Sequence, residues 1–211
     1  MAKSIWIFIF STLILKGAIL HAQDKFLLLD GKTRTGNYKE IKDNIIFYDI
    51  TKHDKTKTKY FSTLDVFSII RSNGDEMLLY KRDTTKGFYL SVEEMRRYIG
   101  GASLAQDHYK SPYAAPFGIV AGSAGIYTAV YGFNISPAYA LAVPVGYVIV
   151  ASVLYPHAKA KKYYPRDRLD DYLYKAGFND IARKKKAMSA IKGSLIGMGI
   201  YAIYTVAISI K

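Results

Sequence analysis

The residues that could perform acid–base or metal chemistry are few and widely spaced in this chain. The four histidines are His21, His53, His108 and His157. No two of them stand in an H-x-x-x-H arrangement, which would place two imidazoles on one helix face, so the pattern predicts no zinc site. Cysteine is absent, which excludes disulfides, thiolate metal sites and thiol nucleophiles. We therefore expect no catalytic residue, no metal, no cofactor and no enzymatic activity.

The adjacent carboxylates Glu93 and Glu94 are better explained by helix capping than by acid–base catalysis. Ser91 and Glu94 have the spacing of a capping box, in which each side chain accepts a hydrogen bond from the other residue's backbone amide. Apolar residues then recur at helical spacing, at Val92, Met95, Ile99 and Ala102. The pattern predicts an amphipathic connecting helix over residues 89–110.

Basic residues are the one charged feature that points to a partner. The net charge is +13, and a large part of it lies between residues 156 and 187. Basic residues beside an apolar segment bind anionic headgroups, at about 1 kcal/mol each. We expect a basic linker over 159–188 whose lipid contacts are Lys159, Lys161, Lys162, Arg183, Lys184, Lys185 and Lys186. Nucleic acid is not expected because no recognition motif is present, and no small-molecule substrate can be identified.

Two long tracts are apolar enough to lie in a bilayer. Residues 111–158 contain no Asp, Glu, Lys or Arg, and a charge at the centre of a membrane helix costs about 2.5–3.5 kcal/mol. The first tract predicts a transmembrane hairpin with spans Pro116–Phe133 and Pro137–Tyr155. The second predicts a C-terminal transmembrane helix over 189–211.

Small residues in these tracts are spaced for close helix packing. The pairs Gly118/Gly122 and Gly193/Gly197 are small-xxx-small motifs, and Gly125 continues the first face. These glycine faces could pack the helices of one subunit together or join several subunits. A conducting pore is disfavoured, because no ionisable residue marks a pathway within the spans.

The amino terminus and the segment after it predict an exported β module. Lys3 and the apolar core Ile5–Leu15 indicate a signal peptide over 1–22, with cleavage after Ala22 preferred to an uncleaved anchor, and either outcome would export the following domain. The pattern of residues 24–88 predicts five or six short strands separated by turn residues, with Thr51–Lys57 as an exposed loop. So many short strands in one segment favour a small SH3-like or Sm-like barrel. Residues 56–60 could form a basic and aromatic ligand-binding face, or they could be ordinary solvent-exposed side chains of a strand.

Membrane topology has two solutions. Two crossings within 111–158 place the β module and the basic linker on one side, whereas a single crossing places them on opposite sides. An exported module with a basic linker beside it conflicts with the positive-inside rule. We nevertheless prefer two crossings, because the tract has two similar halves.

Several short motifs occur in an order that resembles uncharacterised envelope proteins of Bacteroidota. They are Ala22-Gln23, Leu29-Asp30-Gly31, Leu64–Ile69, Asn73–Glu76, Tyr174–Phe178, Arg183–Lys186 and Gly193–Gly199. The resemblance covers most of the chain. It implies no activity and assigns no functional residue.

The sequence thus predicts an α+β membrane protein, with a small barrel followed by two or three transmembrane helices. We expect it in the bacterial inner membrane with the β module facing the periplasm. There it would tether or recruit a partner, which would be another envelope protein or a second copy of itself. The alternative is a homo-oligomeric channel or transport component for small solutes, built on the glycine faces.

Overall fold

The computed structural model describes residues 23–154 apart from 53–54, and residues 165–209 apart from 169. The expected signal peptide and the expected lipid contacts Lys159, Lys161 and Lys162 lie outside the described residues. The chain divides into two compact units. We call the part up to Tyr80 the sheet unit. The helical unit begins at Lys81 and also includes the turn Leu29–Lys32.

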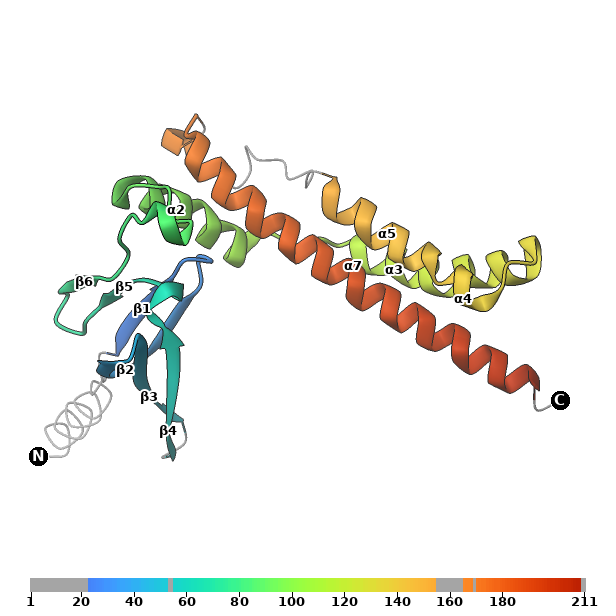
Figure 1. Ribbon diagram of the computed structural model, residues 1–211, viewed down its shortest axis with the longest axis horizontal. Coiled ribbons are helices and arrows are strands. Elements are labelled where there is room, and N and C mark those ends of the chain that lie inside the picture. Colours follow the sequence, from blue (N-terminus) through green and yellow to red (C-terminus); the bar gives the residue numbers. More distant parts are fainter. Residues whose placement is uncertain (1–22, 53–54, 155–164, 169, 210–211) are drawn as a thin grey trace, which may run out of the picture. The chain divides into compact units, whose positions relative to one another are not determined.

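The sheet unit is one open antiparallel sheet (Figure 1). Its strands are β1 (Asp24–Leu28), β2 (Thr33–Lys42), β3 (Ile45–Lys52), β4 (Lys55–Ser62), β5 (Val66–Ile70) and β6 (Glu76–Leu78), and a short 3₁₀ turn, η1 (Thr63–Asp65), precedes β5. The order across the sheet is β4-β3-β2-β1-β5-β6, so the strands follow a meander except that β5 returns to pair with β1.

The prediction of a closed SH3-like or Sm-like barrel is wrong. Within the described residues, β4 and β6 are the two sheet edges and do not pair with each other. Closure would require an apolar inner face along β4, but its first six residues are exposed and only Phe61 and Ser62 are partly buried. Edge strands rich in lysine, like β4, resist further pairing.

The expected turn residues between the strands are present, with positive φ angles at Gly31 (79°), Asn44 (61°) and Gly74 (93°). The tract expected to be a loop at 51–57 instead extends the β3–β4 hairpin, which pairs as far as Lys52 and Lys55. Polar residues can form such a hairpin because both of its faces stay in water. Cross-strand side chains support it, and Thr58 Oγ1 donates to Asp49 Oδ1 at 2.7 Å.

The core of the sheet unit is a small aromatic and aliphatic cluster. Its buried members are Phe26, Leu28, Ile46, Tyr48, Val66 and Ile69. Tyr48 stacks on Phe61 with ring centroids 4.7 Å apart. This contact covers the end of β4 nearest the core, so the six strands form one unit with its own interior.

The described part of the helical unit contains four main helical segments. These are α2 (Val92–His108), α3 (Ala114–Val120), the α4–α5 segment (Pro137–Ala140 and Ala142–Val153), and α7 (Tyr172–Ser209). Two π-helical turns, η3 (Ala121–Gly125) and η4 (Thr128–Gly132), extend α3, and short 3₁₀ turns lie at η2 (Thr84–Lys86) and η5 (Arg166–Arg168).

The capping box at α2 is confirmed, with Ser91 N donating to Glu94 Oε2 at 2.7 Å and Glu94 N to Ser91 Oγ at 3.3 Å.

The long helix α7 differs from the expected linker followed by a separate helix. The sequence predicts a linker over 159–188 and a helix over 189–211, but α7 runs without a break for 38 residues, through Gly177, or about 57 Å at the α-helical rise. The segment contains no proline, and its alanines, lysines and arginines favour helix. A glycine weakens a helix by only about 1 kcal/mol, which packing at this position offsets.

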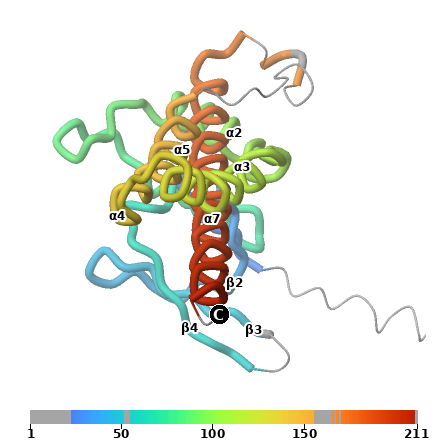
Figure 2. The backbone as a smooth tube through the Cα atoms, turned by 90° about the vertical axis from the view of Figure 1, so that its right-hand side faces the viewer, coloured from blue at the N-terminus to red at the C-terminus, as the bar shows by residue number. Residues whose placement is uncertain are grey.

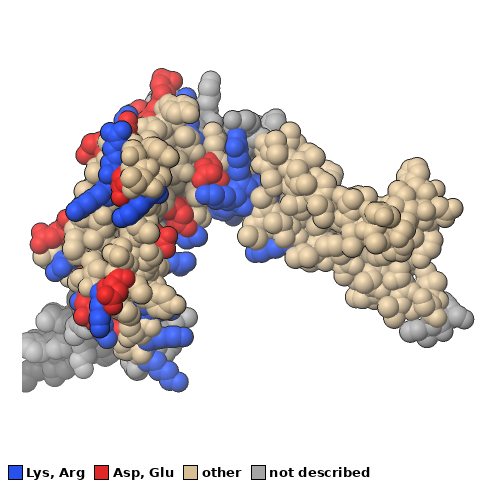
Figure 3. Space-filling model, viewed as in Figure 1, with Lys and Arg blue, Asp and Glu red and all other residues tan. Residues whose placement is uncertain are grey.

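The two halves of α7 have different neighbours and different chemistry. The first half lies along α2, and the second half lies along α3 and α5 (Figures 1 and 2). Charged side chains cover α2 and the first half of α7, whereas the end built from α3, α4, α5 and the last turns of α7 carries none (Figure 3). Charge therefore segregates along the length of the helical unit.

Candidate functional site

The charged end of the helical unit is held by a close crossing of α2 and α7. A Cβ atom placed on Gly177 would lie 2.0 Å from Tyr98 O, and one on Gly101 would lie against Tyr174 O, so only glycine fits at either position. Phe178 and Ala102 beside them are fully buried. The two helices are therefore in backbone contact.

Polar contacts reinforce this crossing. Tyr98 Oη donates to Asp180 Oδ2 at 2.8 Å, and Lys184 Nζ donates to the same oxygen at 2.8 Å. Burial by itself raises the pKa of Asp180, but these two hydrogen bonds hold that pKa below its usual value. Burial, with the neighbouring Asp180, raises the pKa of Tyr98 far above its usual value. This contact therefore favours the ionised form of the Asp180 carboxyl and the neutral form of the Tyr98 phenol.

The uncharged end is held by a second glycine crossing, between α3 and α7. A Cβ on Gly193 would lie 2.1 Å from Ala115 O, and one on Gly197 would lie 2.3 Å from Ile119 O. On the facing helix, a Cβ on Gly118 would lie 2.7 Å from Ala190 O, and one on Gly122 would lie 2.4 Å from Ser194 O. These four predicted packing glycines thus meet within one chain.

Gly125, the fifth predicted packing glycine, has a different neighbour. A Cβ there would meet Val143 Cγ1 of α5 at 2.8 Å, not α7. By contrast, no described atom lies within 4 Å of the position that a Cβ would take on Gly146 or Gly199, so a side chain would fit at both. Close approach is therefore confined to particular glycines.

The basic run Arg183–Lys186 lies between the two crossings, and its members differ in their contacts. Lys185 Nζ donates to Ala105 O at 3.1 Å and to Gln106 O at 2.8 Å, which satisfies carbonyls in the last turn of α2. Burial lowers the pKa of this ammonium. Lys184 is exposed and pairs with Asp180, and Lys186 Nζ is 3.5 Å from Leu154 O. Lys185 is therefore a structural cap, while Lys184 and Lys186 reach the surface.

The uncharged end exposes large apolar side chains. Two helices, Ala114–Gly132 and Tyr172–Ser209, are long and apolar enough to cross a membrane by length and composition. Only 28% of the apolar stretch of the first and 17% of that of the second are buried, whereas the core helix of a soluble protein is mostly buried. Exposed residues include Phe117 (61%), Val153 (69%) and Ile203 (73%).

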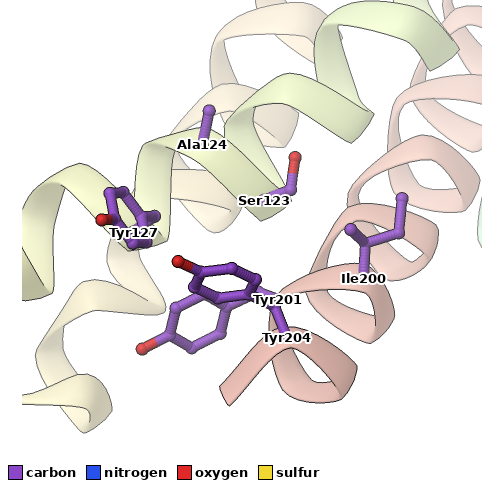
Figure 4. Close-up of a pocket in the computed structure, with 6 residues that line it drawn as sticks. All are labelled: Ser123, Ala124, Tyr127, Ile200, Tyr201 and Tyr204. Carbon is purple, nitrogen blue, oxygen red and sulfur yellow. The ribbon is translucent and has the colours of Figure 1, made fainter. Parts of the chain in front are cut away.

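An apolar pocket of about 350 Å³ lies at this end, between η3 and the last turns of α7 (Figure 4). Tyr201 and Tyr204 extend from α7 toward Tyr127, and the rings of Tyr127 and Tyr204 meet edge to face at 5.7 Å. Ser123 Oγ donates to Ile119 O in its own helix at 2.7 Å. The pocket therefore has the character of an aromatic groove and carries no acid–base pair.

Among the described residues, no group of three or more His, Asp or Glu side chains is placed to hold a metal ion. His108 ends α2. The expected basic and aromatic face, residues 56–60, lies exposed on the edge strand β4, where Tyr60 is 71% exposed.

Sequence reasoning missed the glycines of the α2–α7 crossing and the capping role of Lys185. A signal for the crossing was available, because Gly101 and Gly177 each stand beside apolar residues in an amphipathic helix. The capping role had no local signal, because Lys185 lies far along the chain from the carbonyls it contacts.

Comparison with protein-family models, curated proteins and solved structures finds no significant match to this chain.

Proposed function

We propose that this chain is a membrane-anchored interaction protein of the bacterial envelope. In this proposal the uncharged end of the helical unit is the anchor, and the sheet unit tethers or recruits a partner at the periplasmic face of the inner membrane. The observation that carries the proposal is the exposed apolar surface of the uncharged end, which would be costly to leave in water. Hydrocarbon contact removes that cost.

The lengths of the apolar segments support the anchor. From Gly193 to Ser209, α7 extends about 25 Å at the α-helical rise, which is close to the bilayer core of about 30 Å. The segment from Ala114 to Gly132 is slightly longer. The chain turns at Asn134, whose φ is 54°, and returns through α4 and α5, so three apolar segments lie at this end.

The α2–α7 crossing favours two membrane crossings within residues 111–158. Tyr98 and Lys185 take part in hydrogen bonds between α2 and the first half of α7, so these two segments share one aqueous compartment. An even number of crossings must then separate them. The basic run lies on the side of α2 in this arrangement, despite the positive-inside bias, and the last turn of α7 lies on the other side.

The glycine positions favour an anchor over a channel. The alternative, a homo-oligomeric channel for small solutes, needs glycine faces that are free to meet a second copy. Gly118, Gly122, Gly193 and Gly197 instead lie against backbone atoms of their own chain. The same helices therefore serve more readily as a self-contained anchor.

Single-cysteine labelling tests the anchor, since the natural chain has no cysteine. Ser136→Cys lies in the exposed turn before α4, and Tyr172→Cys lies at the start of α7, where Tyr172 is 79% exposed. In intact cells whose outer membrane has been permeabilised, an impermeant maleimide should label Tyr172→Cys and leave Ser136→Cys unlabelled until the inner membrane is opened. Equal labelling of both positions, or a full chain that stays in solution without detergent, would refute the anchor.

Chemical cross-linking tests the recruiting role separately. A cross-linked partner should be a different protein, and its yield should fall in the β4 variant Lys57→Glu/Lys59→Glu, while the Cys labelling pattern is unchanged. If the cross-links join only copies of this chain and liposomes that contain it become permeable to small solutes, the channel alternative replaces the recruiting role.

A further inference from the structure

A second pocket, of about 420 Å³, lies where the charged and uncharged ends of the helical unit meet. Its wall is formed by the connection from α2 to α3, the first turns of α3, the last turns of α5 and one turn of α7. Lys110 is the last charged residue before the uncharged tract that begins at residue 111. The pocket is therefore at the level where a headgroup region would begin if the uncharged end is in lipid.

The polar part of this pocket is cationic. Lys110 and Lys186 both line it, and the described lining residues include no carboxylate. Lys110 is exposed, and Lys186 is partly buried. The contact of Lys186 Nζ with Leu154 O is 3.5 Å long, at the outer limit for a hydrogen bond, and an ammonium has three donors. Both lysines can therefore donate to an anion.

The rest of the pocket is apolar and continues onto the exposed surface of the uncharged end. Phe117, Val150 and Leu154 line it and are 61%, 55% and 54% exposed. Tyr147 Oη is already engaged as a donor to Ala114 O at 2.8 Å. A ligand that matches this lining has an anionic group for the two lysines and an apolar chain for Phe117, Val150 and Leu154.

We propose that this pocket binds one anionic phospholipid. The phosphate lies between Lys110 and Lys186, and one acyl chain follows Phe117, Val150 and Leu154. A free phosphate leaves the apolar wall in water, and a zwitterionic lipid brings a second, positive group to the lysines. The proposal rests on the membrane anchor proposed above, which places this pocket at the headgroup level.

Native mass spectrometry of the full chain in a neutral detergent tests the site. The probes are phosphatidylglycerol, phosphatidylcholine and inorganic phosphate. We expect one phosphatidylglycerol molecule to bind in preference to phosphatidylcholine, and inorganic phosphate to compete weakly. A lysine beside an anionic headgroup contributes about 1 kcal/mol, or about fivefold in affinity, so Lys110→Gln/Lys186→Gln should weaken phosphatidylglycerol binding more than tenfold.

The matched control is Lys175→Gln/Lys192→Gln, which removes the same charge from positions of α7 outside the pocket. It should change binding less than twofold. Equal loss in the two double variants would overturn the proposal in favour of diffuse electrostatic attraction. Equal binding of phosphatidylcholine, or full competition by inorganic phosphate, would overturn it as well.

The short-chain, water-soluble lipid dihexanoyl-phosphatidylglycerol separates this proposal from the anchor. If the chain proves soluble without detergent, the anchor is refuted. The pocket is then tested by itself, by comparing the binding of this lipid to Lys110→Gln/Lys186→Gln with its binding to the control double variant. Val150→Ser should weaken its binding while leaving the lysines in place. If Val150→Ser has no effect on a lipid that the lysines still recognise, the acyl-chain part of the proposal is wrong.

Discussion

The glycine crossing between α3 and α7 leads to a prediction that separates the effect of packing from that of helix propensity. The two effects change the stability of a glycine-to-alanine variant in opposite directions. We compare Gly193→Ala with Gly199→Ala, two substitutions on the same helix. A Cβ on Gly193 would lie 2.1 Å from Ala115 O, which is about 1.3 Å short of the 3.4 Å at which ordinary contact begins. A Cβ on Gly199 would have no described atom within 4 Å. The two sites therefore differ in packing and share the same gain in helix propensity.

The magnitudes follow from these distances. Alanine in place of glycine favours a helix by about 1 kcal/mol, so Gly199→Ala should be neutral or stabilising. Extra atoms in a packed contact cost about 1–3 kcal/mol, and withdrawal of α3 by more than 1 Å would also weaken dispersion contacts along the crossing. Because the propensity gain cancels in the comparison, Gly193→Ala should be less stable than Gly199→Ala by about 1–3 kcal/mol.

Thermal unfolding of the full chain in mild detergent, followed by far-ultraviolet circular dichroism, measures this difference. For a chain of this size 1 kcal/mol corresponds to about 2–4 °C in Tm, so Gly193→Ala should unfold several degrees below Gly199→Ala. Adding Gly118→Ala to Gly193→Ala should cost less than it does alone, because α3 has already withdrawn.

Equal Tm values for Gly193→Ala and Gly199→Ala would refute the reasoning. A second informative result is an unchanged Tm accompanied by loss of an oligomer in size-exclusion chromatography. That outcome would place the glycine faces between subunits and would favour the channel alternative.

The remaining predictions concern the contacts around α7. Lys185→Met removes both hydrogen bonds to the last turn of α2 and should destabilise the chain by about 1–2 kcal/mol, whereas Lys184→Met, at an exposed ion pair, should cost about 1 kcal/mol or less; equal effects in chemical denaturation would contradict the capping role. The raised pKa of Tyr98 predicts stability that is complete below about pH 10 and is lost as the pH rises toward the folded-state pKa, and Tyr98→Phe should show a smaller alkaline loss. The lowered pKa of Asp180 predicts stability that is present above about pH 4 and is lost as the pH falls below it, so Asp180→Asn should flatten the acid limb of the Tm profile. Ser194 has a buried hydroxyl with no partner among the described residues, so Ser194→Ala should be neutral or raise Tm, and a fall of several degrees would reveal a hydrogen bond.

Local features of the fold could be read from the sequence because local chemistry decides them. The capping box at Ser91 and the turns at Gly31, Asn44 and Gly74 each depend on a few neighbouring residues whose backbone preferences are strong. The segregation of charge also follows directly from the order of residues, since 111–158 contains no charged side chain.

Pairing between distant segments could be decided only in three dimensions. Whether β4 closes onto another strand depends on the number of apolar residues that face inward after the sheet has curved, and the exposed β4 has too few. The role of Gly177 within α7 likewise depends on α2. The backbone of Tyr98 occupies the space that a side chain at position 177 would need, so only glycine fits there. A glycine reads as a helix breaker in isolation and becomes a contact point only when a second helix lies against it.

The sequence alone thus determined the segregation of charge and the positions of the turns, because both depend on residue type and near neighbours. It also placed small residues at Gly118, Gly122, Gly193 and Gly197, but left open what they would meet. Only the tertiary structure decided that they meet one another, that Lys185 caps α2 and that Lys110 and Lys186 share a pocket. These outcomes join residues far apart in the chain, and their free energy comes from close contacts that exist only once the helices are packed.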